Sequence, residues 1–376
     1  MPAVHSVIGS YRLLRGRGQV LRVLESARGL FEATETPVSA RTEWLSAWLA
    51  AFDAVEPIAV VAGDPTDPTG LACLAVARLG PLRTVTLLGD GPSDYGRIPV
   101  RDERAAEAVA VGIANLLRAL PRPWRLRLAQ LPVDDPVAAR VQRVLPAARL
   151  EPGQSCPRLT ISPDRTLEQH MSSSGRRAAR QGRDRLAKTG LESSIDRTRE
   201  PAEIYRLLPA IVALHRTRDH ALGRRSDLDG EPRRRFYIDV VGRLAEIDAI
   251  ELFTLRLEGE LVAFFLGLRD VIGGRTVYRS WDGRISSGYP HLALGRVLRA
   301  HLIEAILADP VVDEIDWMRG ELQHKMLAVT HAQPAQQLLA ESSPMVDTVL
   351  RYATLTRHQV RDHLPGRVRR LIRGHG

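Results

Sequence analysis

Cysteine, lysine and long apolar runs are scarce in this 376-residue sequence. Its two cysteines, Cys73 and Cys156, fall in an expected strand and an expected linker, which excludes a disulfide framework and predicts reduced thiols. No apolar stretch approaches the roughly 20 residues of a membrane-spanning helix. Residues 1–18 also lack the continuous apolar segment of a secretory signal. These absences predict a cytoplasmic protein with no membrane-embedded part.

Positive charge is abundant and is carried almost entirely by arginine. The formal net charge is +9, the sequence pI is about 10.2, and Lys188 and Lys325 are the two lysines. Such a protein attracts anionic partners, for example phosphates, an acidic carrier protein or nucleic acid. The same arginine bias is equally typical of a GC-rich genome. Charge alone therefore leaves tRNA, an acidic carrier protein or no macromolecular partner open.

The length suits two domains, and the predicted secondary structure repeats along the chain. The second half shows three strands, a helix and a strand at 250–257, 261–268, 276–281, 292–308 and 312–318. The same order occurs about 190 residues earlier, at 57–62, 71–78, 83–88, 103–119 and 124–130. A helix between two strands can join parallel neighbours of one sheet. We therefore expect an α+β fold with two mixed sheets and flanking helices.

Short segments in both halves resemble one protein family. They are Trp44-Leu-Ser-Ala-Trp48, Ser93-Asp-Tyr95, Cys156-Pro-Arg-Leu159, Ser174-Gly-Arg-Arg177, Leu294-Gly-Arg-Val-Leu298 and Ile315-Asp-Trp-Met-Arg-Gly-Glu-Leu-Gln-His-Lys325. From about residue 35 to residue 340 the chain resembles the CelD-like, two-domain branch of the GNAT acyltransferase superfamily. That branch is similar to the Fem-type aminoacyltransferases. In the last segment, His324 stands where the family pattern has tyrosine.

The resemblance implies two tandem GNAT-like domains, 1–160 and 161–345, and we expect a basic helical tail at 346–376. It implies an enzyme, an N-acyltransferase that moves an acyl group from a thioester onto an amine of a small-molecule or glycan-type acceptor. The acyl donor would be acyl-CoA or acyl-phosphopantetheine on an acyl carrier protein, with no tightly bound cofactor. Two alternatives stay open: a Fem-like transferase using aminoacyl-tRNA, and a GNAT-like binding scaffold without catalysis.

Acyl transfer to an amine needs a base, donors for the oxyanion and a proton for the leaving thiolate. Glu321 follows the last strand of the second half and is the first candidate for the base. His215 is the second, because a neutral imidazole accepts a proton at pH 7. Asp282, at the end of a meander strand, is the third. No Cys/His set has metal-ligand spacing, so no metal site is expected.

The donor site is expected in the second domain, where two parallel strands diverge and expose backbone groups to a linear thioester arm. The loop Gly288-Tyr-Pro-His-Leu-Ala-Leu-Gly295 stands where GNAT enzymes hold the CoA pyrophosphate on N–H groups at a helix N-terminus. Its glycines are far apart and Pro290 removes a donor. This departure favours a donor held by protein or RNA contacts. We assign donor contacts to Leu294, Gly295 and Arg296.

Further residues near strand ends are expected to contact the substrate: Asp94, Tyr95, Arg216, Trp281, Asp316, Arg319, His324 and Lys325. For Asp316 the alternative is an ion pair with Arg319 or Lys325, and for Lys325 an ion pair with Glu321. Finally, Arg176, Arg180 and Arg183 share one face of a basic helix at 174–188. That face suits an acidic carrier-protein helix or a phosphate backbone, and a solvated helix face is the equally good alternative.

Overall fold

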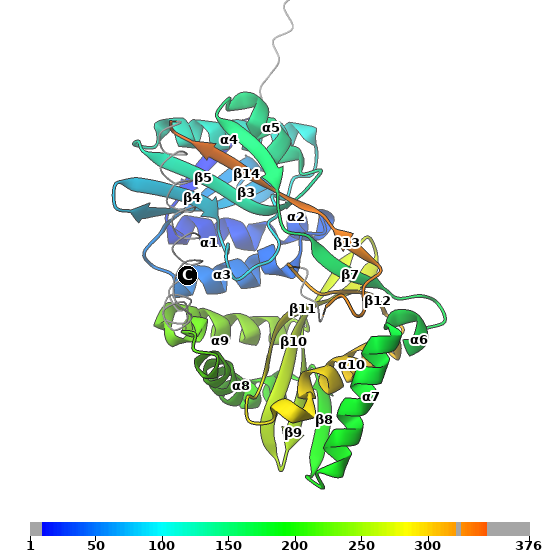
Figure 1. Ribbon diagram of the computed structural model, residues 1–376. Helices are drawn as coiled ribbons and strands as arrows, with labels where there is room; N and C mark the ends of the chain where they lie inside the picture. Colours follow the sequence, from blue (N-terminus) through cyan, green and yellow to red (C-terminus); the bar gives the residue numbers. More distant parts are fainter. Residues whose placement is uncertain (1–9, 321–324, 344–376) are drawn as a thin grey trace, which may run out of the picture. The chain divides into compact units, whose positions relative to one another are not determined.

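The computed structural model describes residues 10–320 and 325–343, which form two compact units. The first holds residues 10–154 and 334–343, and the second holds 155–320 and 325–333. Each unit contains one seven-stranded sheet with flanking helices (Figure 1). The predicted α+β class with two mixed sheets is confirmed. None of the helices in these described ranges is both long and apolar enough to cross a membrane.

The first unit is built on the sheet β1-β2-β3-β4-β5-β14-β6, in which β4 and β5 run parallel. The strands are β1 Tyr11–Arg15, β2 Glu56–Asp64, β3 Asp67–Leu79, β4 Leu82–Leu87, β5 Trp124–Pro132, β6 Ala148–Pro152 and β14 Ala335–Glu341. The helices are α1 Arg17–Ser26, α2 Arg28–Ala33, η1 Val38–Ala40, α3 Thr42–Ala51, α4 Glu103–Ala119 and α5 Pro136–Val144. Helix α4 begins at Asp102, whose side chain accepts from the Ala105 N–H. Its alanine-rich face packs into the core beneath the sheet.

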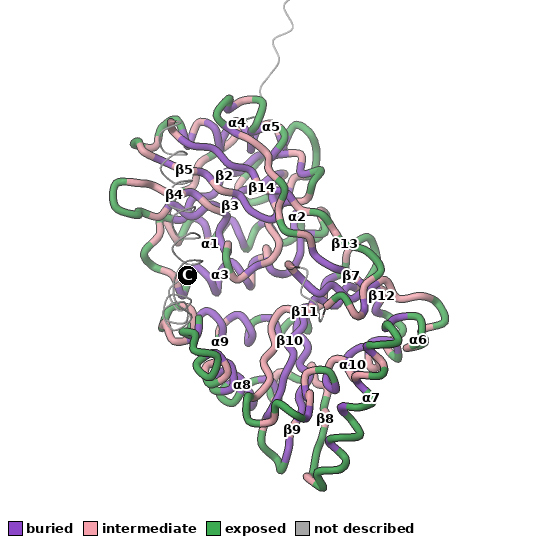
Figure 2. Tube along the Cα trace, viewed as in Figure 1, coloured by how far each residue is buried: buried purple, intermediate pink, exposed green. Residues whose placement is uncertain are grey.

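The second unit is built on the sheet β13-β7-β12-β11-β10-β9-β8, in which β11 and β12 run parallel. The strands are β7 Cys156–Thr160, β8 Ser193–Thr198, β9 Ile250–Leu257, β10 Glu260–Ile272, β11 Arg275–Ile285, β12 Val312–Asp316 and β13 His331–Gln333. The helices are α6 Leu167–His170, α7 Ser173–Lys188, α8 Pro201–Ala221, η2 Asp227–Asp229, α9 Glu231–Glu246, η3 Pro290–Leu292 and α10 Leu294–Leu307. Helices α8 and α9 lie on one side of β9–β11, and α10 with α7 on the other (Figure 1). Figure 2 shows the central strands buried and the outer face of α7 exposed.

The repeated order predicted from the sequence is present in both units. Strand β3 begins at residue 67 and β10 at 260, while β4 begins at 82 and β11 at 275, so both pairs are 193 residues apart. In each sheet the meander is followed by a helix and a strand that returns parallel to the meander's last strand. The two units therefore share the same strand arrangement.

Strand pairing differs from the predicted domain boundaries at two places. Residues 156–160, expected in the first domain, form β7 of the second sheet, where Leu159 pairs with Ile315 of β12. Residues 335–341, expected in the second domain, form β14 of the first sheet, where Leu338 pairs with Leu128 of β5. Strand β7, from the predicted first domain, thus lies beside the parallel pair β11–β12 of the second sheet. Strand β14, from the predicted second domain, lies beside the parallel pair β4–β5 of the first sheet. The expected tail at 346–376 lies outside the described residues.

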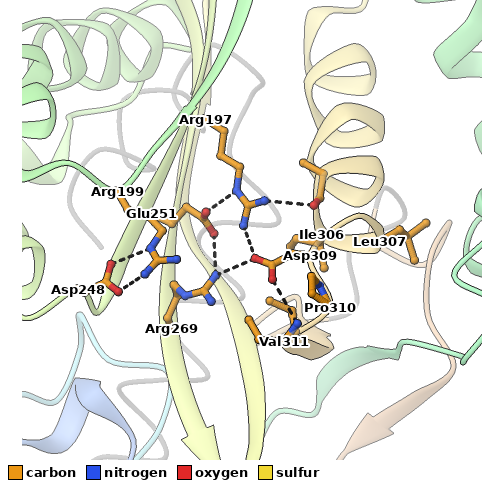
Figure 3. A network of polar contacts seen from close by, with 12 residues as sticks. Arg197, Arg199, Asp248, Glu251, Arg269, Ile306, Leu307, Asp309, Pro310 and Val311 are labelled. Atoms are coloured by element: carbon orange, nitrogen blue, oxygen red, sulfur yellow. Dashed lines mark hydrogen bonds and ion pairs between the residues drawn. The ribbon is translucent and has the colours of Figure 1, made fainter.

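A network of charges fixes the C-terminal end of α10 to the edge of the second sheet (Figure 3). Arg197 of β8 donates to Glu251 of β9 (2.5 Å) and to Asp309 just after α10 (2.7 Å). Arg269 of β10 lies 3.4 Å from Glu251 and 3.6 Å from Asp309. Burial alone would lower the pKa of Arg197, but its bonds to Glu251 and Asp309 raise that pKa above the ordinary value. The network holds the end of α10 against β8, β9 and β10.

Candidate active site

The parallel strands β11 and β12 separate after a short paired stretch. Their register runs from Thr276 opposite Val312 to Arg279 opposite Asp316. Strand β12 then ends, and the chain turns towards β7, with the Trp317 N–H donating to the Pro157 carbonyl (2.9 Å). Strand β11 continues to Ile285. Within the described residues, the stretch 280–285 of β11 has β10 on one edge and no strand on the other.

A bulge turns the side chains of this free stretch. Asp282 lies opposite Leu266, and Ser280 lies opposite Gly267, so Trp281 is the extra residue on β11. Bulges of this kind re-aim side chains and are common beside active sites. Here the bulge lies at the point where β11 loses β12 as its neighbour.

The first unit closes the corresponding gap with its own chain. Strands β4 and β5 separate after Thr86, which pairs with Arg127. The loop beyond β4 then folds onto β5, where the Gly96 N–H donates to the Gln130 carbonyl (2.9 Å). A Cβ atom on Gly96 would overlap the Ala129 carbonyl oxygen, so the contact requires glycine. An extended ligand therefore finds a free strand edge in the second unit and not at this position of the first.

His215 and Asp282 come together beside the free stretch of β11. The His215 side chain of α8 is buried, with 4% of the residue exposed. Its Nε2 lies 3.9 Å from Asp282 Oδ1. Its Nδ1 lies 3.3 Å from Asp219 Oδ2 and 3.1 Å from Ser226 Oγ. A carboxylate only accepts hydrogen bonds, and Asp219 is the nearer of the two, so its position favours the tautomer with the proton on Nδ1 and the lone pair on Nε2.

Asp282 is held in place by two donors. The Tyr237 hydroxyl of α9 donates to Oδ2 (2.8 Å), and Arg284 Nη1 donates to Oδ1 (2.8 Å). The Tyr237 ring also stacks on Trp281, with a centroid distance of 5.4 Å. These contacts fix the carboxylate of Asp282 opposite His215.

Neighbouring groups and burial shift the pKa values of His215 and Tyr237. Burial lowers the pKa of His215 below its ordinary value, and Arg284 acts in the same direction, although Asp282 and Asp219 oppose them. The imidazole is therefore neutral at pH 7 and able to accept a proton. Burial and the neighbouring Asp282 raise the pKa of Tyr237 well above its ordinary value, so its hydroxyl stays protonated as a donor.

Sequence reasoning named His215, Asp282 and Trp281 but missed the residues that connect them. Asp219 carried a usable signal, because it lies four residues after His215 on the same helix and so shares its face. Tyr237, Ser226 and Arg284 carried none that distinguishes them from ordinary helix, loop and strand residues. Their role appears through contacts between α8, α9 and β11.

Gly283, between Asp282 and Arg284 of β11, is required by close packing. A Cβ atom there would overlap the Phe265 ring and lie 3.0 Å from the Phe264 carbonyl oxygen of β10. We expect Gly283→Ala to lower the free energy of unfolding by about 1–3 kcal/mol through overpacking. Urea unfolding measures this loss. Gly288→Ala is the matched control, since its Cβ would meet only Ser286 Oγ at 3.5 Å, and equal effects of the two changes would contradict the prediction.

The predicted donor-binding residues lie at the start of α10. Ala293 adopts a left-handed conformation (φ 53°) immediately before the helix. Leu294 is buried in the core, Gly295 is partly exposed and Arg296 is exposed. A Cβ atom on Gly295 would lie 2.9 Å from Ile285 Cδ1, so glycine lets the helix start close to the end of β11. The Leu294 side chain is a core residue, and a donor contact there is limited to its backbone.

Asp316 was predicted to contact the substrate, but the structure places it in the interior of the second sheet. It is fully buried, its Oδ2 accepts from Arg279 (2.7 Å) and its Oδ1 accepts from the Met318 N–H (2.8 Å). Arg279 also donates to the buried Asp270 (2.5 Å). Burial on this scale excludes direct contact with a substrate. The structure shows ion pairs of Asp316 with Arg279 (2.7 Å) and Arg158 (3.5 Å), where the sequence suggested Arg319 or Lys325.

Other predicted substrate residues have structural partners. Lys325 Nζ donates to the carbonyls of Arg319 (2.7 Å) and Met318 (3.2 Å), which holds the turn after β12. Arg216 of α8 is paired with Asp229 of η2 (2.9 Å). Arg319 is partly buried within that same turn. Glu321 and His324 lie outside the described residues.

Asp94 and Tyr95 belong to the first unit, whereas His215 belongs to the second. They follow Ser93, whose hydroxyl donates to the Tyr95 carbonyl (2.7 Å). Their assignment to the substrate therefore stays a prediction.

The three arginines predicted to bind a partner have different surroundings on α7. Arg176 donates to the Glu168 and Met171 carbonyls at the start of the helix. Arg183 is paired with Glu304 of α10 (2.6 Å). Arg180 is exposed. Arg183 thus links α7 to α10, and Arg176 holds the segment before α7.

In the described part of the chain, no group of three or more His, Cys, Asp or Glu side chains is placed to hold a metal ion.

Comparison with protein families finds a match for part of the second unit. Residues 173–326 match the model of the acetyltransferase (GNAT) domain. That range begins in α7 and includes β11, α10 and β12. No curated protein matches the sequence.

Several solved structures have a similar fold at low identity. FemX has a TM-score of 0.60 at 9% identity, over 90% of this chain and 99% of that one. The C-terminal domain (DUF2156) of an Agrobacterium fabrum protein, named as a candidate lysylphosphatidylglycerol synthetase, has a TM-score of 0.56 at 11% identity, over 89% and 96%. A conserved Bacteroides thetaiotaomicron protein of unknown function has a TM-score of 0.53 at 12% identity, over 85% and 97%. These likenesses concern the fold alone. Residues 173–326, in the second unit, therefore match a GNAT domain, and the whole chain is similar in fold to FemX and to the other two structures.

Proposed function

We propose that the protein is an N-acyltransferase that moves an acyl group from a thioester to an amine in its second unit. The observation that supports this most is the free stretch of β11, which begins where β12 ends and bears Asp282 beside His215. Alternate N–H and C=O groups of a strand edge are aligned to pair with an extended arm. A donor thioester bound along this edge would bring its carbonyl to the His215–Asp282 pair.

The chemistry assigned to these residues is direct attack by the amine. The acceptor nitrogen would lie beside His215 Nε2 and Asp282 Oδ1, which are 3.9 Å apart and so can both accept from one nitrogen. As the nitrogen bonds to the acyl carbon, its proton passes to Nε2 and the carbon–sulfur bond breaks. The proton then goes to the thiolate, so the products are an amide and a thiol. Asp219 and Ser226 hold the imidazole in the tautomer that this step needs.

The test is turnover by the purified full-length chain. The protein is incubated with acetyl-CoA, longer acyl-CoAs or acyl-carrier protein together with a panel of amines, amino sugars among them. Amide and free thiol are measured by mass spectrometry and a thiol reagent. Amide formation that depends on both substrates supports the proposal. Absence of amide with every thioester overturns it and favours a scaffold without catalysis.

A second candidate is transfer of an aminoacyl group from tRNA. The net charge of +9 and the exposed Arg177 and Arg180 of α7 favour an anionic macromolecule. Pro290, at the start of η3, removes an N–H from the loop that would otherwise bind a pyrophosphate. The discriminating measurement is the ultraviolet spectrum of protein purified at low salt. RNA that co-purifies and dissociates along a steep salt dependence supports this candidate.

The pH dependence of turnover follows from the environment of His215. Its pKa is lowered, so the base form persists to a pH below the ordinary histidine value of 6.5. We expect kcat/KM, calculated on the neutral fraction of the acceptor amine, to stay level as the pH falls to 6.5 and to decline only below it, as the imidazole takes up a proton. A pH–rate profile of the free enzyme measures this. An acid limb centred above pH 6.5 would contradict the assignment of His215 as the base.

A further inference from the structure

Four side chains of the second unit form a closed cycle of contacts around the candidate base. From His215 Nε2 the cycle runs to Asp282 Oδ1 (3.9 Å), and the same oxygen accepts from Arg284 Nη1 (2.8 Å). Arg284 Nε lies 3.6 Å from Asp219 Oδ1, and Asp219 Oδ2 lies 3.3 Å from His215 Nδ1. His215 and Arg284 thus share the same two carboxylates.

The backbone of two elements brings these side chains together. Asp282 and Arg284 are two residues apart on β11, so they project from the same face of the strand. His215 and Asp219 are four residues apart on α8 and share one face of that helix. The side chains of His215, Asp219 and Asp282 are at most 12% exposed, so solvent screens their charges weakly.

The charges of this cycle balance only when Arg284 is counted. Asp282 and Asp219 carry two negative charges, while Arg284 and Arg224, whose Nη2 lies 3.2 Å from Asp219 Oδ1, carry two positive ones. Burial lowers the pKa of His215, and Arg284 adds to this effect, whereas the two aspartates oppose it because they attract a proton to the imidazole. The titratable and charged groups that face His215 are Asp219 of α8, Asp227 of η2, Tyr237 of α9, and Asp282 and Arg284 of β11. Of these, Arg284 is positively charged.

Arginine suits this place because a guanidinium presents N–H groups in several directions from one planar fork. Nη1 of Arg284 donates to Asp282 and to the Gly283 carbonyl (3.0 Å), while Nε faces Asp219. We propose that Arg284 is a positioning residue, which holds the two aspartates on either side of the His215 imidazole and whose charge opposes protonation of this base. Its effect on turnover rests on the proposed acyl transfer, whereas its effect on His215 is measured without substrates.

Titration of His215 in the full-length protein tests the proposal. The ring is followed by nuclear magnetic resonance with labelled histidine, and its signal is identified by its loss in His215→Gln. In Arg284→Gln we expect the titration midpoint of His215 to move to higher pH, because the two aspartates then attract a proton without an opposing charge. The acid limb of kcat/KM should move in the same direction. An unchanged midpoint in folded Arg284→Gln overturns the proposal.

Two further variants separate charge from position. Arg284→Lys keeps the charge without the fork, so the His215 midpoint should stay near the parental pH while kcat falls about tenfold, the equivalent of one hydrogen bond. A parental kcat in Arg284→Lys overturns the positioning role, even if Arg284→Gln does not fold. Arg275→Gln is the matched control: it removes the same charge at the start of β11, about 30 Å along the strand, and should leave the His215 midpoint unchanged.

This design also distinguishes failure of the inference from failure of the proposed function. If the parent protein forms no amide with any thioester, the acyl-transfer proposal fails, while a shifted His215 midpoint in Arg284→Gln still supports the electrostatic role of Arg284. If amide forms but the midpoint does not shift, acyl transfer stands and the role of Arg284 is overturned.

Discussion

Replacing His215 with glutamine is expected to lower kcat for amide formation about 10²- to 10⁴-fold, the usual contribution of a positioned general base. Glutamine fills similar space and still hydrogen-bonds Ser226 or Asp219, but it cannot take a proton from the acceptor amine. Steady-state kinetics with the best substrate pair of the panel measure the loss. The thermal midpoint of unfolding should change little, because the polar contacts of the side chain can be retained.

His220→Gln is the matched control for this change. His220 lies on the same helix, five residues further on, is exposed and pairs with Asp229 (2.7 Å). It should keep the parental kcat. If both variants lose activity equally, the effect belongs to the α8–α9 connection and not to proton transfer. A pH profile separates the two cases further, since His215→Gln should also remove the acid limb of kcat/KM.

Asp282→Asn tests the second member of the His215–Asp282 pair. Asparagine keeps the shape but removes the charge that faces His215 and the acceptor nitrogen. We expect kcat/KM to fall, and the pKa of His215 to fall further, because Asp282 is the largest influence that raises it. Nuclear magnetic resonance titration of the His215 ring reads this shift directly. An unchanged His215 titration would show that the two side chains do not interact in solution.

The local elements of the second unit could be predicted from sequence because their signals are local. The Glu258-Gly259 pair forms the expected hairpin turn, with φ of 49° and 76° at its two positions. Helix α10 ends at Leu307, before Asp309-Pro310, as the proline requires. The free edge of β11 was likewise expected, but from the resemblance to GNAT enzymes and not from the order of elements, because the first unit has the same order and closes its gap.

Contacts between distant elements could not be predicted in the same way. His215 and Asp282 were each named from their own surroundings, yet their approach depends on how α8 packs on β11. Asp316 was judged by its place near a strand end, whereas Arg279 and Asp270 on neighbouring strands decide its burial. Side-chain alternation gives the face of a strand but not the residue opposite on the next strand.

Strand β7 belongs to the second sheet and β14 to the first, which no local pattern in the sequence indicates. This pairing predicts opposite effects for substitutions in the two strands. Leu338→Ala, in the late segment β14, should destabilise the first unit, and Leu159→Ala, in the early segment β7, should destabilise the second. Both leucines are buried (0% and 1% exposed), and such truncations cost about 2–5 kcal/mol. Hydrogen exchange resolves the location: Leu338→Ala should lower protection in β4 and β5, and Leu159→Ala in β11 and β12.

Gln337→Ala is the control for the first of these changes. Gln337 lies on β14 next to Leu338, is partly exposed, and its substitution should stay within about 0.5 kcal/mol of the parent. The opposite pattern, with Leu338→Ala loosening β11 and Leu159→Ala loosening β5, would restore the boundaries expected from sequence and contradict the strand pairing. The predicted pattern means that neither sheet is complete within a continuous half of the chain. Fragments cut at residue 160 would then each lack the strand beside their parallel pair, which is why the two units are expected to fold only as one chain.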